Sequence, residues 1–273
     1  MTTTARRMFE LVEPIGALPY AAEDPNEAMF ALGFTDFWDT YFAGRAAPLG
    51  DVPAEVVDAL FFNFAPGEVA RHIPKVWRTT TPEAAIAARR AGCATALRRI
   101  LGDPVDGPGF ARAAELLLHA ATSAPVHGRP MYAALRALDP PDDVAERCFH
   151  AASLLREHRG DGHIAALVVD GIGGLEAHAL HALGQGMPAH RFGRIHHLPR
   201  PQIDAIVEGL RERGIVGDDG ELSDEGRALH RRVEDRTDAL ATAPYEALTT
   251  DELGELVAAL EGMAPALLAD QAW

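Results

Sequence analysis

Apolar residues recur three and four positions apart along nearly the whole of this chain, which is the spacing of a helix with one buried face. Clusters of Pro and Gly interrupt the pattern, as in residues 103–109 and 184–188. Thr81, Ser223 and Thr250 precede acidic residues, so we interpret them as helix caps. The sequence therefore predicts a mainly α fold with helices over residues 5–15, 25–43, 54–64, 67–76, 82–101, 110–123, 130–138, 142–158, 163–183, 201–213, 224–241 and 251–268.

A different pattern follows the helix predicted over residues 201–213. Residues 215–222 alternate apolar and polar side chains around Asp218, Asp219 and Gly220, which is typical of a short β-hairpin. A helix precedes this hairpin and another helix follows it. The C-terminal half is therefore predicted to be a winged helix, with the hairpin as its wing.

Weak internal similarity at an offset of about 140 residues indicates a duplication. Residues 81–90 align with residues 223–232, and residues 114–117 align with residues 254–257. We therefore expect two pseudo-symmetric, degenerate winged-helix halves. These are an N-terminal half over residues 1–138 and a C-terminal half over residues 139–273, with a small-molecule pocket at their junction, where pockets tend to form.

The composition restricts the partners of the chain. The formal net charge is −15 over 273 residues, which argues against nucleic acid as the main partner because duplex binding depends on clustered basic groups. No apolar run is long enough to span a membrane, and residues 1–10 lack the apolar core of a signal peptide. We interpret Cys93 and Cys148 as free buried thiols. We expect a cytoplasmic monomer or homodimer with no membrane partner.

Residues 156–163 contain two histidines, two arginines, a glutamate and an aspartate between apolar flanks. Burying such groups is costly unless they are paired or used in chemistry. Three interpretations stay open. The arginines and the acidic residues could pair and close a helix–helix corner at Gly160 and Gly162. The same groups could bind a polar ligand through the guanidinium fork of arginine, or they could carry out acid–base chemistry.

In the acid–base interpretation, His158 or His163 transfers a proton while Asp161 fixes the tautomer. His158 and His163 match no standard zinc spacing, so we predict no metal site, and the sequence names no cofactor. The internal alignment and the aromatic segment over residues 34–42 supply further pocket candidates. The predicted ligand-binding residues are Tyr20, Glu23, Trp38, Tyr41, Glu157 and Arg159.

The segment LREHRGDGHIAAL at residues 155–167, together with residues 41–50 and the predicted wing, resembles a poorly characterised family of bacterial helix-turn-helix proteins that are often described as MarR-like. The resemblance covers nearly the whole chain and implies a fold more than an activity. A MarR-like regulator is expected to have a basic recognition helix and a basic wing. Here the wing carries Asp218, Asp219 and Glu221, and acidic residues offset the arginines of the helix.

We therefore favour a protein that binds a small organic molecule, in one version an enzyme of specialised metabolism that uses His/Asp acid–base chemistry. A ligand-responsive MarR-like transcription regulator is the alternative. In a purely structural interaction module, the charged segment would be only a salt-bridged corner.

Overall fold

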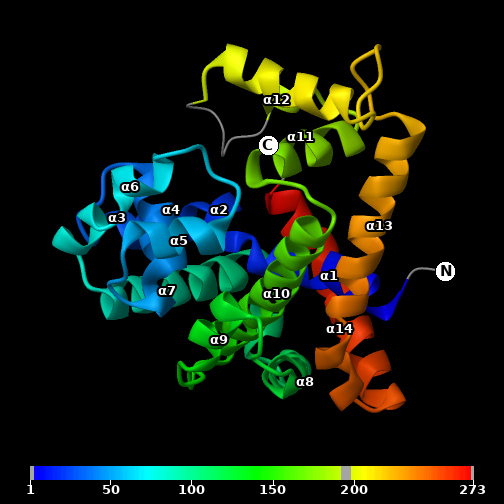
Figure 1. Cartoon of the computed structure of the whole chain (residues 1–273). Coiled ribbons are helices and arrows are strands. Elements are labelled where there is room, and N and C mark those ends of the chain that lie inside the picture. The colour runs from blue at the N-terminus through cyan, green and yellow to red at the C-terminus, as the bar shows by residue number, and fades with distance from the viewer. Residues whose placement is uncertain (1–2, 192–197, 272–273) are drawn as a thin grey trace. The chain divides into compact units, whose positions relative to one another are not determined.

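The computed structural model describes residues 3–191 and 198–271, and its regular structure is helical throughout (Figure 1). Contacts divide the chain into two compact units. Unit 1 contains residues 1–52, 72–161 and 241–273, and unit 2 contains residues 53–71 and 162–240. Each unit draws on both of the halves expected from the sequence, and the duplication itself stays a prediction. No helix among the described residues is long and apolar enough to cross a membrane.

Unit 1 is built around one apolar core to which helices from all three of its segments contribute. The largest fully buried side chains include Tyr132, Phe42 and Met8. Cys93 and Cys148 are both buried and free, as predicted. The helices are α1 (Thr4–Gly16), α2 (Leu18–Ala21), α3 (Glu23–Phe30), α4 (Phe37–Ala46), α7 (Pro82–Leu101), α8 (Pro108–Ser123), α9 (Pro130–Arg136), α14 (Thr250–Asp270) and the first part of α10 (Val144–Val169).

Local sequence sets the bounds of α7, which match the prediction. The hydroxyl of Thr81 accepts the backbone N–H of Ala84 at 3.2 Å, and Pro82 occupies the first turn, where its missing N–H costs nothing. Gly102 ends the helix with a positive φ of 67°. For α14 the cap is Thr249, which forms a capping box with Glu252, so the prediction of Thr250 was one residue too late.

The single helix predicted over residues 25–43 is wrong. The structure has α3 and α4 there, separated by residues 31–36. Gly33 has a φ of 103°, which a helix cannot contain, and the Asp36 carboxylate caps α4 by accepting the N–H groups of Trp38 and Asp39.

Close backbone approach fixes α3 against α7. A Cβ atom on Gly92 would lie 2.6 Å from the Cα of Pro25, so only glycine fits at this crossing. Elsewhere in unit 1, α14 packs against α1 and α8. The ion pair between Arg7 and Glu261 at 2.5 Å joins the exposed edges of α1 and α14.

Helix α10 runs without interruption from Val144 to Val169 (Figure 1). The predicted break between residues 158 and 163, with a corner at Gly160 and Gly162, is therefore wrong. Each glycine in a helix interior costs about 1 kcal/mol relative to alanine. The buried contacts of the flanking polar residues, described below, offset that cost.

Unit 2 has its own apolar core, which includes Leu180, Leu210, Val216 and Leu229. Arg232 and Arg236 of α13 pair with Asp170, which follows α10. Its helices are α5 (Ala54–Phe61), α6 (Glu68–His72, of which His72 belongs to unit 1), the end of α10, α11 (Gly174–Gly184), α12 (Arg200–Glu212) and α13 (Asp224–Leu240).

The β-hairpin wing predicted over residues 215–222 is wrong. The described residues contain no strand, and Val216 and Leu222 form only an isolated antiparallel bridge. The predicted turn is present: Gly220 has a φ of 82° and its N–H donates to the carbonyl of Gly217 at 3.0 Å. With one bridged pair, the segment is too short to form a ladder, because two-stranded hairpins are marginal even at greater length.

Candidate functional site

The polar residues of α10 contact several other helices, and Arg156 contacts α1. Its guanidinium forms a bidentate ion pair with Glu13 of α1, with Nε 3.2 and 3.0 Å from the two carboxylate oxygens and Nη2 3.1 Å from one of them. The Arg156 Cζ atom also lies 5.2 Å from the centre of the Tyr20 ring. Arg156 therefore joins α10 to α1 and to the short helix α2.

Glu157 forms the most deeply buried ion pair of unit 1. Arg45 of α4 donates from Nε and Nη2 to the two Glu157 oxygens at 3.1 and 3.0 Å, and from Nη1 to the Tyr41 hydroxyl at 3.2 Å. Burial alone would raise the pKa of this carboxyl, but Arg45 and Arg156 lower the pKa of Glu157 to about 2. Glu157 is therefore ionised and fully engaged.

Asp161 caps the N-terminus of α9. Its carboxylate accepts the backbone N–H groups of Tyr132 at 3.0 Å and Met131 at 3.5 Å. Burial raises the pKa of Asp161 to about 6, because the two amide bonds only partly compensate for the lost hydration. This carboxylate is directed at a helix end, so the predicted pairing in which it orients a histidine is not the contact that the structure gives it.

His158 lines a small pocket inside unit 1. Its imidazole lies edge-on to the Tyr132 ring with centres 5.0 Å apart, and its backbone carbonyl accepts from Arg129 Nη1 at 2.6 Å. The side chain is buried, yet its ring nitrogens have no hydrogen-bond partner among the described residues. Burial lowers the pKa of His158 to about 4, so the ring is neutral at pH 7.

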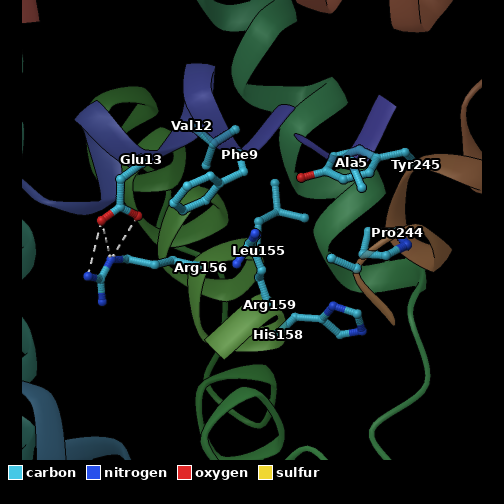
Figure 2. A pocket seen from close by; sticks show the side chains of 11 residues that line it. Ala5, Phe9, Val12, Glu13, Leu155, Arg156, His158, Arg159, Pro244 and Tyr245 are labelled. Carbon is cyan, nitrogen blue, oxygen red and sulfur yellow. Dashed lines mark hydrogen bonds and ion pairs between the residues drawn. The ribbon is translucent and has the colours of Figure 1, made fainter. Parts of the chain in front are cut away.

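The pocket beside this imidazole, here called the His158 pocket, lies between α1, α10 and residues 241–245 (Figure 2). Its cavity volume is about 10 Å³, room for one water. The Tyr245 hydroxyl is turned toward Leu155 and, in the described part of the chain, finds no hydrogen-bond partner. The lining residues are Ala5, Phe9, Val12, Glu13, Leu155, Arg156, His158, Arg159, Ala241, Pro244 and Tyr245.

Arg159 completes the polar side of this pocket. Its Cζ atom lies 4.2 Å from the centre of the Phe9 ring, a cation–π contact. Burial raises the pKa of Tyr245, and the charge of Arg159 offsets part of that rise. The pocket thus combines the Arg159 guanidinium, the paired Glu13 and Arg156, a neutral imidazole and a phenol hydroxyl with an apolar wall.

The structure separates His163 from the other two predicted catalytic residues. His163 belongs to unit 2, where its Nδ1 lies 3.0 Å from the Thr237 hydroxyl and 3.9 Å from a Glu234 oxygen. His158 and Asp161 belong to unit 1 and face a pocket and a helix end, respectively. The three are therefore not gathered around one point inside either unit.

The predicted ligand-binding residues outside α10 have three different surroundings. Tyr20 and Tyr41 have ring centres 5.1 Å apart and line a second small cavity with Arg89. Trp38 contacts the Tyr41 ring at 5.5 Å but does not line that cavity. Glu23 is exposed in the first turn of α3 and takes part in neither cavity.

One group of ligating side chains was not found from the sequence. Asp36, Asp39 and His72 have ligand atoms within 4.8 Å of one another. His72 Nδ1 and Lys75 Nζ each lie 2.7 Å from an Asp39 oxygen, so both oxygens of Asp39 already have cationic or hydrogen-bonding partners. We therefore interpret these side chains as an ion-pair cluster.

The pocket residues that sequence reasoning missed are Phe9, Glu13 and Tyr245. Glu13 and Arg156 are 143 positions apart, and no local spacing connects them. From the sequence, Arg45 is a candidate ligand anchor, but the interpretation we favoured was a cation at a helix end that interacts with the helix dipole. Its burial beside Glu157 had one available signal, the apolar context of residues 41–47.

In unit 2, the helix–turn–bridge segment over residues 200–222 carries three basic and six acidic side chains. All three arginines are paired: Arg200 with Asp204 at 3.1 Å, Arg213 with Glu176 at 2.8 Å, and Arg211 with Glu208. A phosphate-binding surface requires unpaired cations. The segment therefore keeps the excess of acidic over basic side chains that the sequence predicts, and its arginines are paired with acidic residues.

Comparison with known families gives a match that covers nearly the whole chain. A helix-turn-helix family model matches residues 5–273. No curated protein and no solved structure matches the chain.

Proposed function

The chain belongs to a helix-turn-helix family, and from that premise we propose that it binds a small polar organic molecule in the His158 pocket. The observation that carries the proposal is a pair of polar side chains, His158 and Tyr245, which line the same cavity and whose polar atoms form no hydrogen bond with another described residue. Polar groups that converge on one cavity without protein partners favour a ligand there.

The lining groups define the chemistry of this ligand. The Tyr245 hydroxyl and the Arg159 guanidinium are donors, which favours a carboxylate or carbonyl oxygen. A neutral His158 offers one donor and one acceptor. Phe9 and Leu155 supply an apolar wall for the rest of the molecule. A small carboxylic acid or carbonyl compound with an apolar body fits these groups best.

The cavity of about 10 Å³ holds only a water, so binding has to widen the pocket. The segment over residues 241–245 runs from the end of α13 into the short helix over residues 243–247 and contributes three lining residues. It is therefore the element that would move. In the proposal, the ligand enters as this segment moves away from α1.

In an enzymatic version of the proposal, His158 is the only residue that transfers a proton. A neutral imidazole with unused nitrogens can accept a proton from a bound substrate. In this version, Asp161 contributes by fixing α9 and its Tyr132, against which the imidazole lies. His163, bonded to Thr237, has no role in the chemistry.

A panel of small aliphatic and aromatic carboxylic acids, screened by thermal unfolding of the full chain, tests the proposal. We expect saturable stabilisation by at least one acid in the wild type. Tyr245→Phe should raise its Kd about tenfold, since the loss of a buried hydrogen bond to a charged group costs about 1.5 kcal/mol or more. His127→Gln is the matched control, because His127 is exposed and does not line the pocket. Equal binding by Tyr245→Phe, His158→Gln and wild type would rule out this pocket.

Membership of a helix-turn-helix family favours a second candidate, a ligand-responsive transcription regulator. The acidic, fully paired surface of residues 200–222 weighs against it. Electrophoretic titration with the DNA upstream of the chain's own gene decides between them, because specific binding would be tight and would weaken steeply with salt.

A further inference from the structure

We propose that unit 1 holds a small monovalent anion, of the size of a halide or a carboxylate group, in a second cavity next to Arg89. This cavity, here called the Arg89 pocket, shares no lining residue with the His158 pocket. The proposal therefore stands whether or not an organic ligand binds beside His158.

The Arg89 pocket is formed by α2, α3, α4 and α7. Its cavity volume is about 10 Å³, so it accepts one water or one ion of similar size. Gly44 allows the arginine to lie close to α4, because a Cβ atom at residue 44 would be 3.2 Å from Arg89 Cδ. The lining residues are Pro19, Tyr20, Pro25, Asn26, Met29, Thr40, Tyr41, Gly44 and Arg89.

Two donors of this pocket have no acceptor. Arg89 donates from Nη1 to the Gly44 carbonyl at 2.7 Å and from Nη2 to the Tyr20 hydroxyl at 2.8 Å, but its buried Nε has no partner. The Tyr20 hydroxyl accepts from Arg89, and nothing in the described part of the chain accepts the Tyr20 proton. Unused N–H and O–H groups around one cavity require an acceptor.

The other polar groups on the wall do not supply that acceptor. Thr40 Oγ1 donates to the Phe37 carbonyl at 2.7 Å, Asn26 Nδ2 donates to the Ala22 carbonyl at 3.0 Å, and the Tyr41 hydroxyl accepts from Arg45 at 3.2 Å. None of their oxygen atoms accepts a hydrogen bond from Arg89 Nε. The missing acceptor has to come from outside the chain.

Charge identifies the acceptor as an anion. In the described residues, no carboxylate lies within ion-pair distance of Arg89, whose two hydrogen-bond partners are both neutral. The charge of Glu157 acts on Arg89 at longer range, and the Tyr20 and Phe149 rings lie 5.5 and 5.7 Å from its Cζ atom, but none of these groups accepts from Nε. The nearby Arg45 and Arg156 are held by Glu157 and Glu13. A guanidinium with a buried Nε and no carboxylate partner is costly, and a bound anion removes that cost.

Size and charge restrict the anion further. A phosphate or sulfate ion needs several times the space of a water and carries more charge than one guanidinium offsets. A halide or a carboxylate group is smaller than phosphate and carries a single charge, although either has to widen the cavity of about 10 Å³. Arg89 Nε and the Tyr20 hydroxyl are hydrogen-bond donors of the kind that bind such groups. The two sources are a free ion and the carboxylate end of a larger molecule.

The test measures thermal unfolding of the full chain in sodium chloride, bromide, formate and benzoate, with sodium isethionate, a bulky sulfonate, added to keep ionic strength constant. We expect saturable stabilisation by chloride and bromide. Saturation by formate or benzoate at lower concentration than chloride identifies a carboxylate as the ligand. Equal stabilisation by isethionate and chloride at every concentration overturns the proposal.

Two variants assign the effect to the pocket. Arg89→Gln should raise the half-saturating anion concentration at least about tenfold, because a charge-assisted hydrogen bond is lost. Tyr20→Phe should raise it less, since one neutral donor is removed. Arg98→Gln is the control: it removes a cation from the same helix, at an exposed ion pair with Asp143. An unchanged anion response in Arg89→Gln contradicts the proposal.

A crystal soaked in sodium bromide provides a readout that needs no variant, in case Arg89→Gln does not fold. We expect an anomalous peak within hydrogen-bond distance of Arg89 Nε and the Tyr20 hydroxyl. A crystal with bromide elsewhere on the surface and none in the Arg89 pocket overturns the proposal.

Discussion

Arg45 and Glu157, 112 positions apart in the chain, form a two-point ion pair in the interior of unit 1. Each side chain is less than one-tenth exposed. The desolvation cost of such a pair is repaid only while both partners are present.

Glu157→Gln is therefore expected to destabilise the chain by about 3–5 kcal/mol, because Arg45 would stay buried without its counterion. Urea unfolding at pH 7 measures this change. Asp204→Asn, which breaks the exposed pair with Arg200, should cost less than about 0.5 kcal/mol. A similar cost for the two variants would mean that the buried pair contributes nothing special.

Acid should weaken the same pair. The pKa of Glu157 is about 2 in the folded chain and about 4.3 in an unfolded one. Its contribution is therefore complete above about pH 4.3 and is lost as the pH falls toward 2. Glu157→Gln should show a smaller decline in unfolding free energy over that interval than the wild type.

Asp161 has the opposite pH dependence. Its pKa of about 6 in the folded chain exceeds the unfolded value of about 3.9, so the folded state holds the proton more tightly. Wild-type stability should therefore fall as the pH rises from about 4 to about 6. Asp161→Asn keeps an oxygen for the Tyr132 N–H and does not titrate. The variant should gain stability relative to wild type across that interval, measured by urea unfolding at pH 4, 5 and 7.

Gly160→Ala tests the uninterrupted α10. A Cβ atom there would meet only the Glu157 carboxylate at 3.7 Å, an ordinary contact, so we expect stabilisation by about 0.5–1 kcal/mol. Gly92→Ala, whose Cβ would lie 2.6 Å from Pro25 Cα, should instead destabilise by about 1–3 kcal/mol. Destabilisation by Gly160→Ala would instead favour the corner at residue 160 that was expected from the sequence.

The two thiols should resist modification in the folded chain. Cys93 and Cys148 are fully buried, and burial raises the pKa of the Cys148 thiol to about 12, so neither forms a thiolate near neutral pH. Ellman's reagent is expected to detect no fast-reacting thiol in native protein and two in denaturant without reductant. One or no thiol in denaturant would indicate a disulfide.

The sequence predicted the elements whose limits depend on neighbouring residues. Helix α7 has its cap, its proline and its terminal glycine in the sequence itself, so both bounds were right. The turn at Gly220 was also right, for the same reason. The corner at Gly160 was wrong, because local rules count the cost of a glycine but not the distant contacts that keep the helix intact.

Only part of the candidate site could be predicted from the sequence. The charged segment of α10 was recognised, but its partners Glu13 and Arg45 come from α1 and α4 and no spacing rule pairs them. Asp161 was predicted to fix the tautomer of His158 or His163, whereas it caps α9. A single sequence shows which groups are expensive to bury. It does not show which remote group compensates each one.

The packing of α14 against α1 has a consequence for biosynthesis. During translation, α1 is synthesised about 240 residues before α14, the helix that packs against it. Unit 2 is complete once residue 240 has emerged, whereas unit 1 has to wait for residues 250–270. Nascent chains stalled before that point should expose the face of α1 that contacts α14 and recruit chaperones, and emergence of α14 should end that exposure.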